Sequence, residues 1–170
     1  MSFFTRIFGS RKRSGEGLVP LYTAIVAEAR DPAWYRDGAV PDTLDGRFDM
    51  IAALLTLVLL RLEAAGLASD SVALTETFIA DMDGSVRQMG IGDMMVGKHV
   101  GRMVSALGGR LSAFRAAGDG SLEPAVVRNI FHESPPSAQA VAFVTARLER
   151  FRESVAALAP AALLEGKLTA

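Results

Sequence analysis

The feature that most constrains the fold is an uninterrupted apolar run from Ile51 to Leu60, which is bracketed by Asp49 and Arg61. A helix that spans a bilayer needs about 20 predominantly apolar residues, so this run is too short to cross one. The largest apolar side chains around it recur at steps of three and four, as on one face of a helix, and Gly66 ends the pattern. The run therefore predicts a helix at the centre of a globular core.

The composition favours helices in the rest of the chain. Half of the 170 residues are apolar, and good helix formers such as alanine and leucine are far commoner than isoleucine and tyrosine. The length suits one domain, and neither an internal repeat nor an inter-domain linker interrupts the sequence. We expect an all-α fold, a single-domain bundle of about six helices.

Apolar periodicity, candidate caps and prolines place these helices along the chain. Trp34 and Tyr35 are expected in a loop between the first two helices, and Pro160 is expected to close the last one. Asp93 is expected to cap the fourth helix. The six predicted helices cover approximately residues 19–30, 41–65, 69–87, 93–117, 122–132 and 137–158.

One side of the fourth predicted helix carries only small residues: Gly97, Gly101, Ser105, Gly108 and Ser112. Glycine inside a helix costs about 0.5–1 kcal/mol relative to alanine, so several on one side indicate that another backbone approaches closely. The simpler interpretation is packing within the bundle. The alternative is a groove into which a helix of a partner docks.

Net charge and cysteine content exclude several classes of function. A formal net charge of -1 lacks the basic excess of proteins that hold nucleic acid through its phosphates, so we expect no specific nucleic-acid partner. Without cysteine the chain forms neither a disulfide nor a thiolate metal site, which favours a cytoplasmic location.

Catalytic and metal-binding patterns are also missing from the sequence. Asp81 and Asp83 are two positions apart, so on a helix their carboxylates point in different directions, and no further ligand follows at the spacing of a calcium loop. His99 and His132 are the only histidines, and no nucleophile elbow, zinc pair or phosphate loop accompanies them. We expect no metal, no cofactor and no enzymatic activity.

The N-terminal segment, residues 1–16, has the pattern of a short helix that lies on a membrane surface, and residues 17–170 form the helical domain. Four apolar residues fall on one face at helical spacing, beside three cations. These membrane-contact candidates are Phe3, Phe4, Ile7, Phe8, Arg11, Lys12 and Arg13. The alternative is a docked or frayed terminus.

Charged residues concentrate at the start of the central helix and around the turn before the fourth one. An acid such as Asp42 meets the positive end of a helix dipole, but Arg47 beside it needs a carboxylate partner. The acids between Asp81 and Asp93 are the natural candidates, so we expect ion pairs across the bundle. Asp83 and Arg87, one turn apart, are expected to pair locally.

The fourth helix also carries a basic row. Such a row is usually a solvated face, and the acids of the preceding stretch make ion pairs between the two helices the alternative. Methionines flank this stretch, and we expect them either in the core or on an adaptable contact surface. The basic residues are Lys98, His99, Arg102 and Arg110, and the methionines are Met82, Met89, Met94, Met95 and Met103.

Three segments together resemble the ubiquinol-cytochrome c chaperone family. They are VPDTLDGRFDM at 40–50, DMDGSVRQMGIGD at 81–93 and VGK at 96–98, within a resemblance that extends from about Leu21 to Asn129. With Arg102 added from the basic row, the expected motif or partner-binding residues are Asp42, Asp45, Gly46, Arg47, Phe48, Asp81, Met82, Asp83, Arg87, Gly90, Gly92, Asp93, Gly97, Lys98 and Arg102.

The resemblance implies an assembly factor, a chaperone for respiratory complex III, that acts on newly made cytochrome b or another subunit of that complex. Mitochondrial members of the family work with a small partner protein near the inner membrane. This chain lacks a long transit-like extension, so we expect a bacterial cytoplasmic protein peripheral to the inner membrane. The residues leave a second class open, a carrier that binds an apolar small molecule such as a quinone or a lipid in a helical cavity.

Overall fold

The structure of the protein is a computed structural model that describes residues 15–88, 90 and 92–169. This part of the chain folds entirely into helices and connecting turns, which confirms the all-α prediction. The elements are the 3-10 helix η2 (Gly15–Leu18) and the α-helices α1 (Val19–Ala29), α2 (Pro32–Arg36), α3 (Leu44–Ala64), α4 (Ala68–Gln88), α5 (Asp93–Ala117), α6 (Glu123–Asn129), α7 (Ala138–Ala157) and α8 (Pro160–Leu164).

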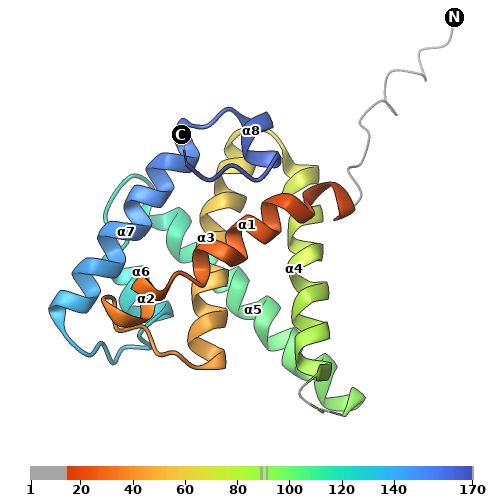
Figure 1. Ribbon diagram of the computed structural model, residues 1–170, viewed down its shortest axis with the longest axis horizontal. Helices are drawn as coiled ribbons and strands as arrows, with labels where there is room; N and C mark the ends of the chain where they lie inside the picture. The colour runs from red at the N-terminus through yellow and green to blue at the C-terminus, as the bar shows by residue number, and fades with distance from the viewer. Residues whose placement is uncertain (1–14, 89, 91, 170) are drawn as a thin grey trace, which may run out of the picture.

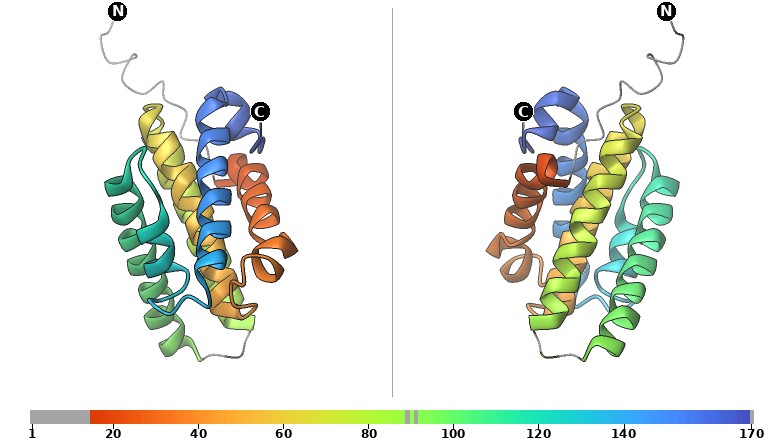
Figure 2. Two further views of the ribbon diagram at one scale, coloured as in Figure 1. Left: turned by 90° about the vertical axis from the view of Figure 1, so that its left-hand side faces the viewer. Right: turned by 90° about the vertical axis from the view of Figure 1, so that its right-hand side faces the viewer.

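Helix α3 is the centre of the bundle, as the apolar run predicts. It contacts α1, α4, α5 and α7, and every side chain from Asp49 to Leu59 is buried. Figure 1 shows α1 crossing α3 between α7 and α4, and Figure 2 shows α5 on one outer side of the bundle with α1 and α2 on the opposite side. Of the helices in the described part, none has the length and hydropathy required to span a bilayer.

Two short helices, α2 and α8, lie where the sequence analysis expects a loop and a chain stop. Each begins with a proline at its first position, where the fixed φ angle suits a helix and the missing N–H removes no bond. Asp31 caps α2 by accepting a hydrogen bond from Ala33 N at 2.8 Å. The prolines were therefore interpreted correctly as the ends of the preceding helices, but the prediction that no helix begins at them is wrong. Trp34 is fully buried and anchors α2 in the core.

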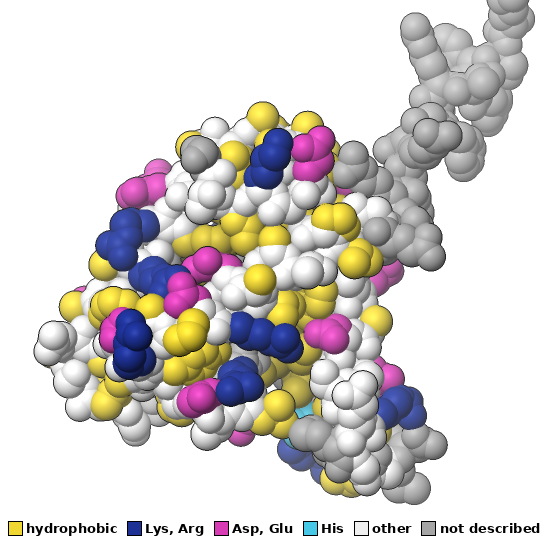
Figure 3. Space-filling view, viewed as in Figure 1, with side chains coloured by type: hydrophobic (Ala, Val, Ile, Leu, Met, Phe, Trp, Pro, Cys, Tyr) yellow, Lys and Arg dark blue, Asp and Glu magenta, His cyan; other side chains and the backbone are white. Residues whose placement is uncertain are grey.

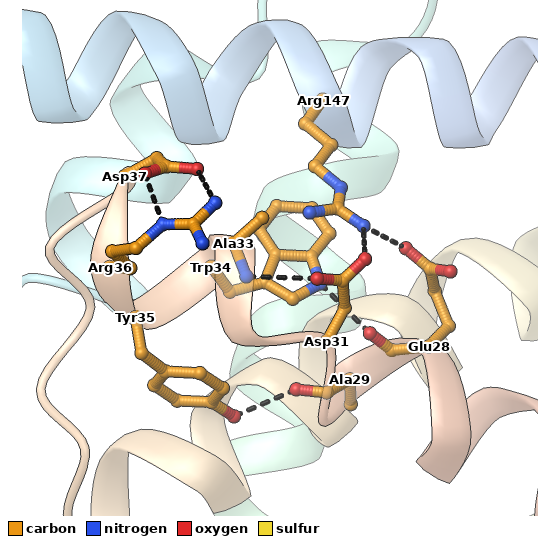
Figure 4. A network of polar contacts seen from close by, with 9 residues as sticks. All are labelled: Glu28, Ala29, Asp31, Ala33, Trp34, Tyr35, Arg36, Asp37 and Arg147. Atoms are coloured by element: carbon orange, nitrogen blue, oxygen red, sulfur yellow. Dashed lines mark hydrogen bonds and ion pairs between the residues drawn. The ribbon is translucent and has the colours of Figure 1, made fainter.

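Arg147 on α7 ties that helix to α1 and α2, as Figure 4 shows. Its Nη2 donates to Glu28 Oε1 at 2.9 Å and to Asp31 Oδ2 at 2.6 Å, while its guanidinium lies 4.2 Å from the ring centroid of Trp34. Trp34 Nε1 in turn donates to the Glu28 carbonyl at 2.9 Å. We call these four residues the Arg147 network. On the face of the molecule shown in Figure 3, basic and acidic side chains are intermixed.

Candidate functional site

The turn before α3 explains why Arg47 does not reach across the bundle. Its Nε donates to Asp42 Oδ1 at 2.7 Å, and both side chains are 57% exposed. The hydrogen bond from Arg47 lowers the pKa of Asp42. Gly46 lies so close to the Pro41 carbonyl that a Cβ there would come within 1.9 Å of the oxygen, so the tight turn puts the partner next to Arg47. Among the acids whose side chains the structure describes, Asp81 and Asp83 bond other partners, so the expected ion pair between Arg47 and these two is wrong.

Helix α4 uses its motif acids in two other ways. Asp81 accepts a hydrogen bond from Tyr22 on α1, with 2.7 Å between the phenolic oxygen and Oδ2, and burial together with this bond raises the pKa of Tyr22. Asp83 pairs with Arg87 at 2.7 Å, which confirms the local pair expected one turn apart. Met82 between them is buried in the core. These motif residues of α4 therefore stabilise the packing of α4 and its last turns.

The junction between α4 and α5 differs in its cap from the expectation. Gly90 has φ +74°, a left-handed conformation that favours glycine. Gly92, not Asp93, occupies the N-cap position of α5, and Asp93 is the first residue of the helix. The side chain of Asp93 lies outside the described part, as do the N-terminal membrane-contact candidates Phe3 to Arg13.

Helix α5 turns its small residues away from the bundle. Gly97, Gly101, Ser105, Gly108 and Ser112 are all exposed, and we call them the small-residue face of α5. A Cβ added at any of its three glycines would meet nothing within 4 Å. The expectation that this side packs inside the bundle is therefore wrong. The reason is that the apolar stripe on the opposite side of α5 packs against α3 and α4, which leaves the small-residue face outside the bundle.

Cations flank this face. Lys98 and Arg102 are exposed and make no polar contact within the described part of the chain, and no acidic residue follows Asp93 in the helix. Val104, on the same side, is 38% exposed. Because α5 is outermost in Figure 2, this cationic, nearly side-chain-free surface is accessible to another molecule.

The methionines are split between core and surface. Met82 is 7% exposed in the core, Met103 is half-buried against it and Met95 is 53% exposed. Met89 and the side chain of Met94 lie outside the described residues. Among the methionines whose side chains the structure describes and that were expected on a contact surface, Met95 alone is exposed enough to belong to one.

A buried ion pair joins α3 to α5 and forms the base of a cleft. Arg110 Nη2 donates to Asp49 Oδ1 and, at 2.9 Å, to the Asn129 carbonyl after α6. Asp49 Oδ2 also lies 2.7 Å from His132 Nε2. Arg110 and Asp49 are each only 3% exposed, and the Arg110 guanidinium lies 5.4 Å from the Phe48 ring centroid.

Burial dominates the electrostatics of this pair. It raises the pKa of Asp49, while Arg110 and His132 beside the carboxyl group oppose the rise. Burial likewise lowers the pKa of Arg110, and Asp49 opposes that shift. A lone buried charge costs several kcal/mol, so each group is stable in its charged form because the other is present.

This centre was not predicted from the sequence. Arg110 was expected in the basic row, and His132, which lies with φ +48° in the turn after α6 ends at Asn129, was not connected to it. Asp49 and Arg110 are 61 positions apart, so no spacing rule connects them. A signal did exist, because Arg110 lies three positions from Leu107 and four from Phe114, on the core side of the helix.

The histidine cleft, as we name it, lies between α3, α5 and the α6 turn and has a volume of about 540 Å³. Asp45, Phe48 and Arg102 of the predicted site line it, together with the Asp49–Arg110 pair and both histidines of the chain. Asp42 and Arg47 instead line a separate hollow of about 480 Å³ beside Arg30 and Arg36. The first predicted motif is thus divided between two sides of α3.

Comparison with known proteins gives two matches over most of the chain. A family model described as ubiquinol-cytochrome C chaperone matches residues 36–170, a span that begins and ends later than the resemblance at residues 21–129. The crystal structure of the Cbp3 homolog from Brucella abortus is 27% identical, with a TM-score of 0.77 over 98% of this chain and 95% of that chain. No curated protein matches.

Proposed function

Because this chain belongs to the ubiquinol-cytochrome c chaperone family, we propose that it assists assembly of the ubiquinol-cytochrome c reductase by holding newly made cytochrome b at the cytoplasmic face of the membrane. The proposed action is binding without catalysis. His132 and Asp49 resemble part of a catalytic dyad, but Asp49 is committed to Arg110 and the described lining of the cleft has no serine, threonine or cysteine nucleophile.

The small-residue face of α5 is the observation that carries this proposal. Helices that associate in membranes approach closely through glycine, alanine and serine, and a membrane protein not yet assembled presents such helices. In this chain the equivalent residues are exposed, with open space above Gly101 and Gly108. The cations Lys98 and Arg102 beside them suit a client near an anionic membrane surface.

Filling this face tests the proposal. A Gly101→Leu/Gly108→Leu variant adds two side chains to open space, so the fold is expected to stay intact while a client helix is kept at a distance. Ala142→Leu/Ala156→Leu is the matched control on exposed positions of α7. In a strain that depends on each variant, we expect the α5 variant to lower cytochrome b and assembled reductase and the α7 variant to preserve both. Normal levels in both strains would refute the α5 face as the client site.

The alternative function, a carrier for a quinone or a lipid, finds less support at the hollow beside Arg47. It would use an apolar cavity beside Arg47 or Lys98, and the hollow beside Arg47 has four charged lining residues. Such a lining suits a charged group better than a quinone ring. Mass spectrometry of the purified protein tests the carrier directly, since a co-purified quinone would favour it.

The N-terminal segment contributes membrane attachment in this proposal. Its four apolar residues and three cations support an interfacial helix near the client. Deleting residues 1–13 is expected to reduce flotation with anionic liposomes without changing the melting temperature. Equal flotation of the deleted and full-length chains would remove the anchor from the proposal.

A further inference from the structure

The histidine cleft is not explained by client binding on the small-residue face. On α5 its lining residues include His99 and Arg110, which lie on a different side of the helix from Gly97 and Gly101, and Arg102, which lies at the border between the two sides. Its volume of about 540 Å³ falls within the range of small-molecule sites. Both histidines of the chain line it, although they come from different helical segments.

The base of the cleft holds an incompletely bonded arginine. In the described part of the chain, Arg110 makes hydrogen bonds through Nη2 only, to Asp49 and Asn129. Its Nε is buried and has no hydrogen-bond partner, although a buried donor without a partner costs free energy. The guanidinium thus lies at the base of the cleft with one donor that the described part of the bundle does not satisfy.

The rim of the cleft adds free positive charge. Arg102 and Arg128 line it and are exposed, and neither they nor His99 makes a polar contact with any residue that the structure describes. Two acids face these cations, and one of them, Asp49, is already neutralised by Arg110. Asp45 is the other, so the rim retains a positive excess.

The rest of the lining is apolar. Phe48, Met103 and Ala106 lie beside the charged rim, and Gly109 leaves its position on α5 open. A small inorganic anion would leave these groups without a partner. An anionic headgroup attached to an alkyl chain would contact both parts of the lining.

We infer that the histidine cleft binds an amphiphile through its carboxylate or phosphate headgroup, with Arg102 and Arg128 holding the oxyanion and Phe48 and Met103 contacting the apolar chain. The inference goes beyond the proposed chaperone function and does not depend on it. A lipid of the bilayer and a soluble amphiphile offer the same headgroup chemistry.

Calorimetric titration of the full-length protein with dodecyl phosphate, kept below its micelle concentration, tests the inference. An Arg102→Gln/Arg128→Gln variant removes two exposed cations that have no partner among the described residues. Its affinity for dodecyl phosphate is expected to fall by about tenfold or more, since charge-assisted hydrogen bonds are the strongest of their kind. The control Arg36→Gln/Arg150→Gln removes the same charge from exposed positions outside the cleft and is expected to bind as the wild type does. Equal affinity of both variants would overturn the inference.

A second variant and two further probes separate headgroup from chain. Gly109→Leu places a side chain in the open space of the cleft without changing charge, so it is expected to abolish binding with no loss of melting temperature. Inorganic phosphate and the neutral dodecyl maltoside are each expected to bind far more weakly than dodecyl phosphate. Equal binding of either probe, or full binding by Gly109→Leu, would overturn the inference.

Vesicles identify the source of the amphiphile once binding is established. Phosphatidylcholine vesicles that contain phosphatidic acid support the inference with a bilayer lipid if they displace dodecyl phosphate equally from the wild type and from the Arg36→Gln/Arg150→Gln control, while vesicles of phosphatidylcholine alone do not. Retention of dodecyl phosphate supports it with a soluble amphiphile.

Discussion

Two arginines join helices in this molecule, and their surroundings differ. Arg147 bonds Glu28 and Asp31 and lies against the Trp34 ring, which ties α7 to α1 and α2. Arg110 bonds Asp49 and lies against the Phe48 ring, which ties α5 to α3. In both cases one guanidinium binds carboxylate oxygens and lies against an aromatic ring, and these contacts hold distant segments together.

The difference lies in what surrounds each arginine. The Arg147 side chain is 18% exposed and has two acidic partners, Glu28 and Asp31. The Arg110 side chain is 4% exposed, has a buried Nε without a partner and lies at an open cleft next to an uncovered helix face. The Arg147 network thus has its charged groups paired, whereas the α5 side has exposed cations, Lys98 and Arg102, without a partner among the described residues.

The largest expected effect comes from removing the buried carboxylate. Asp49→Ala leaves Arg110 buried without its counter-charge, so we expect the free energy of unfolding to fall by about 3–5 kcal/mol in urea denaturation. Asp49→Leu/Arg110→Met removes both charges and is expected to regain much of that loss. A loss for Asp49→Ala below about 1 kcal/mol would show that Arg110 is not buried as described.

Arg147→Met is expected to cost less than Asp49→Ala. Its partners Glu28 and Asp31 are 31% and 41% exposed and remain solvated when the cation is removed. We expect a decrease of about 1–2 kcal/mol in the free energy of unfolding, after allowing for solvent screening. If Arg147→Met destabilised the fold as much as Asp49→Ala, the contrast between the two arginines would be lost.

Alanine on the small-residue face is expected to stabilise the free protein. Gly101→Ala and Gly108→Ala each add a better helix former in open space, so the free energy of unfolding rises by about 0.5–1 kcal/mol for each. Thermal denaturation of the two single variants measures this gain. A decrease in melting temperature would mean that another segment of the chain covers the face.

The smallest expected effect is a pH dependence in the Arg147 network. Hydrogen bonds from Arg147 and from Ala33 N–H lower the pKa of Asp31 from 3.8. A carboxyl group with a lowered folded-state pKa stabilises the fold above its unfolded pKa and loses that contribution as the pH falls through the folded value. Asparagine can still cap α2, so the stability gap between wild type and Asp31→Asn is expected to be roughly 0.5 kcal/mol at neutral pH.

Titrating that gap separates the charge from the cap. As the pH falls below 3.8 and through the lowered folded-state pKa of Asp31, the carboxylate becomes protonated, so the gap between wild type and Asp31→Asn is expected to shrink toward zero. A gap that stays constant from pH 7 to pH 2 would show that the charge of Asp31 contributes nothing to the network.

Local patterns predicted the fold because helices depend on neighbouring residues. The core stripe of α5, the buried run of α3 and the Asp83–Arg87 pair all follow from steps of three and four. Asp31–Pro32 and Pro160 were misinterpreted because a proline that ends one helix can begin the next.

The site was harder to predict because its contacts join distant positions. The partners of Asp49, Arg110 and Asp81 lie on other helices, so their identity depends on how the bundle packs. The glycines of α5 indicated a close neighbour, but only the packing of α3 and α4 against the other side shows that none of the described residues provides it.

The most direct measurement is site-specific photo-crosslinking in cells that assemble the reductase. A photoreactive amino acid replaces Ser105 on the small-residue face of α5 or, in a matched protein, Ala156 on the exposed side of α7. We expect a crosslink to cytochrome b from position 105 and none from position 156. A crosslink from position 156 with none from position 105 would contradict the central claim that α5 holds the client.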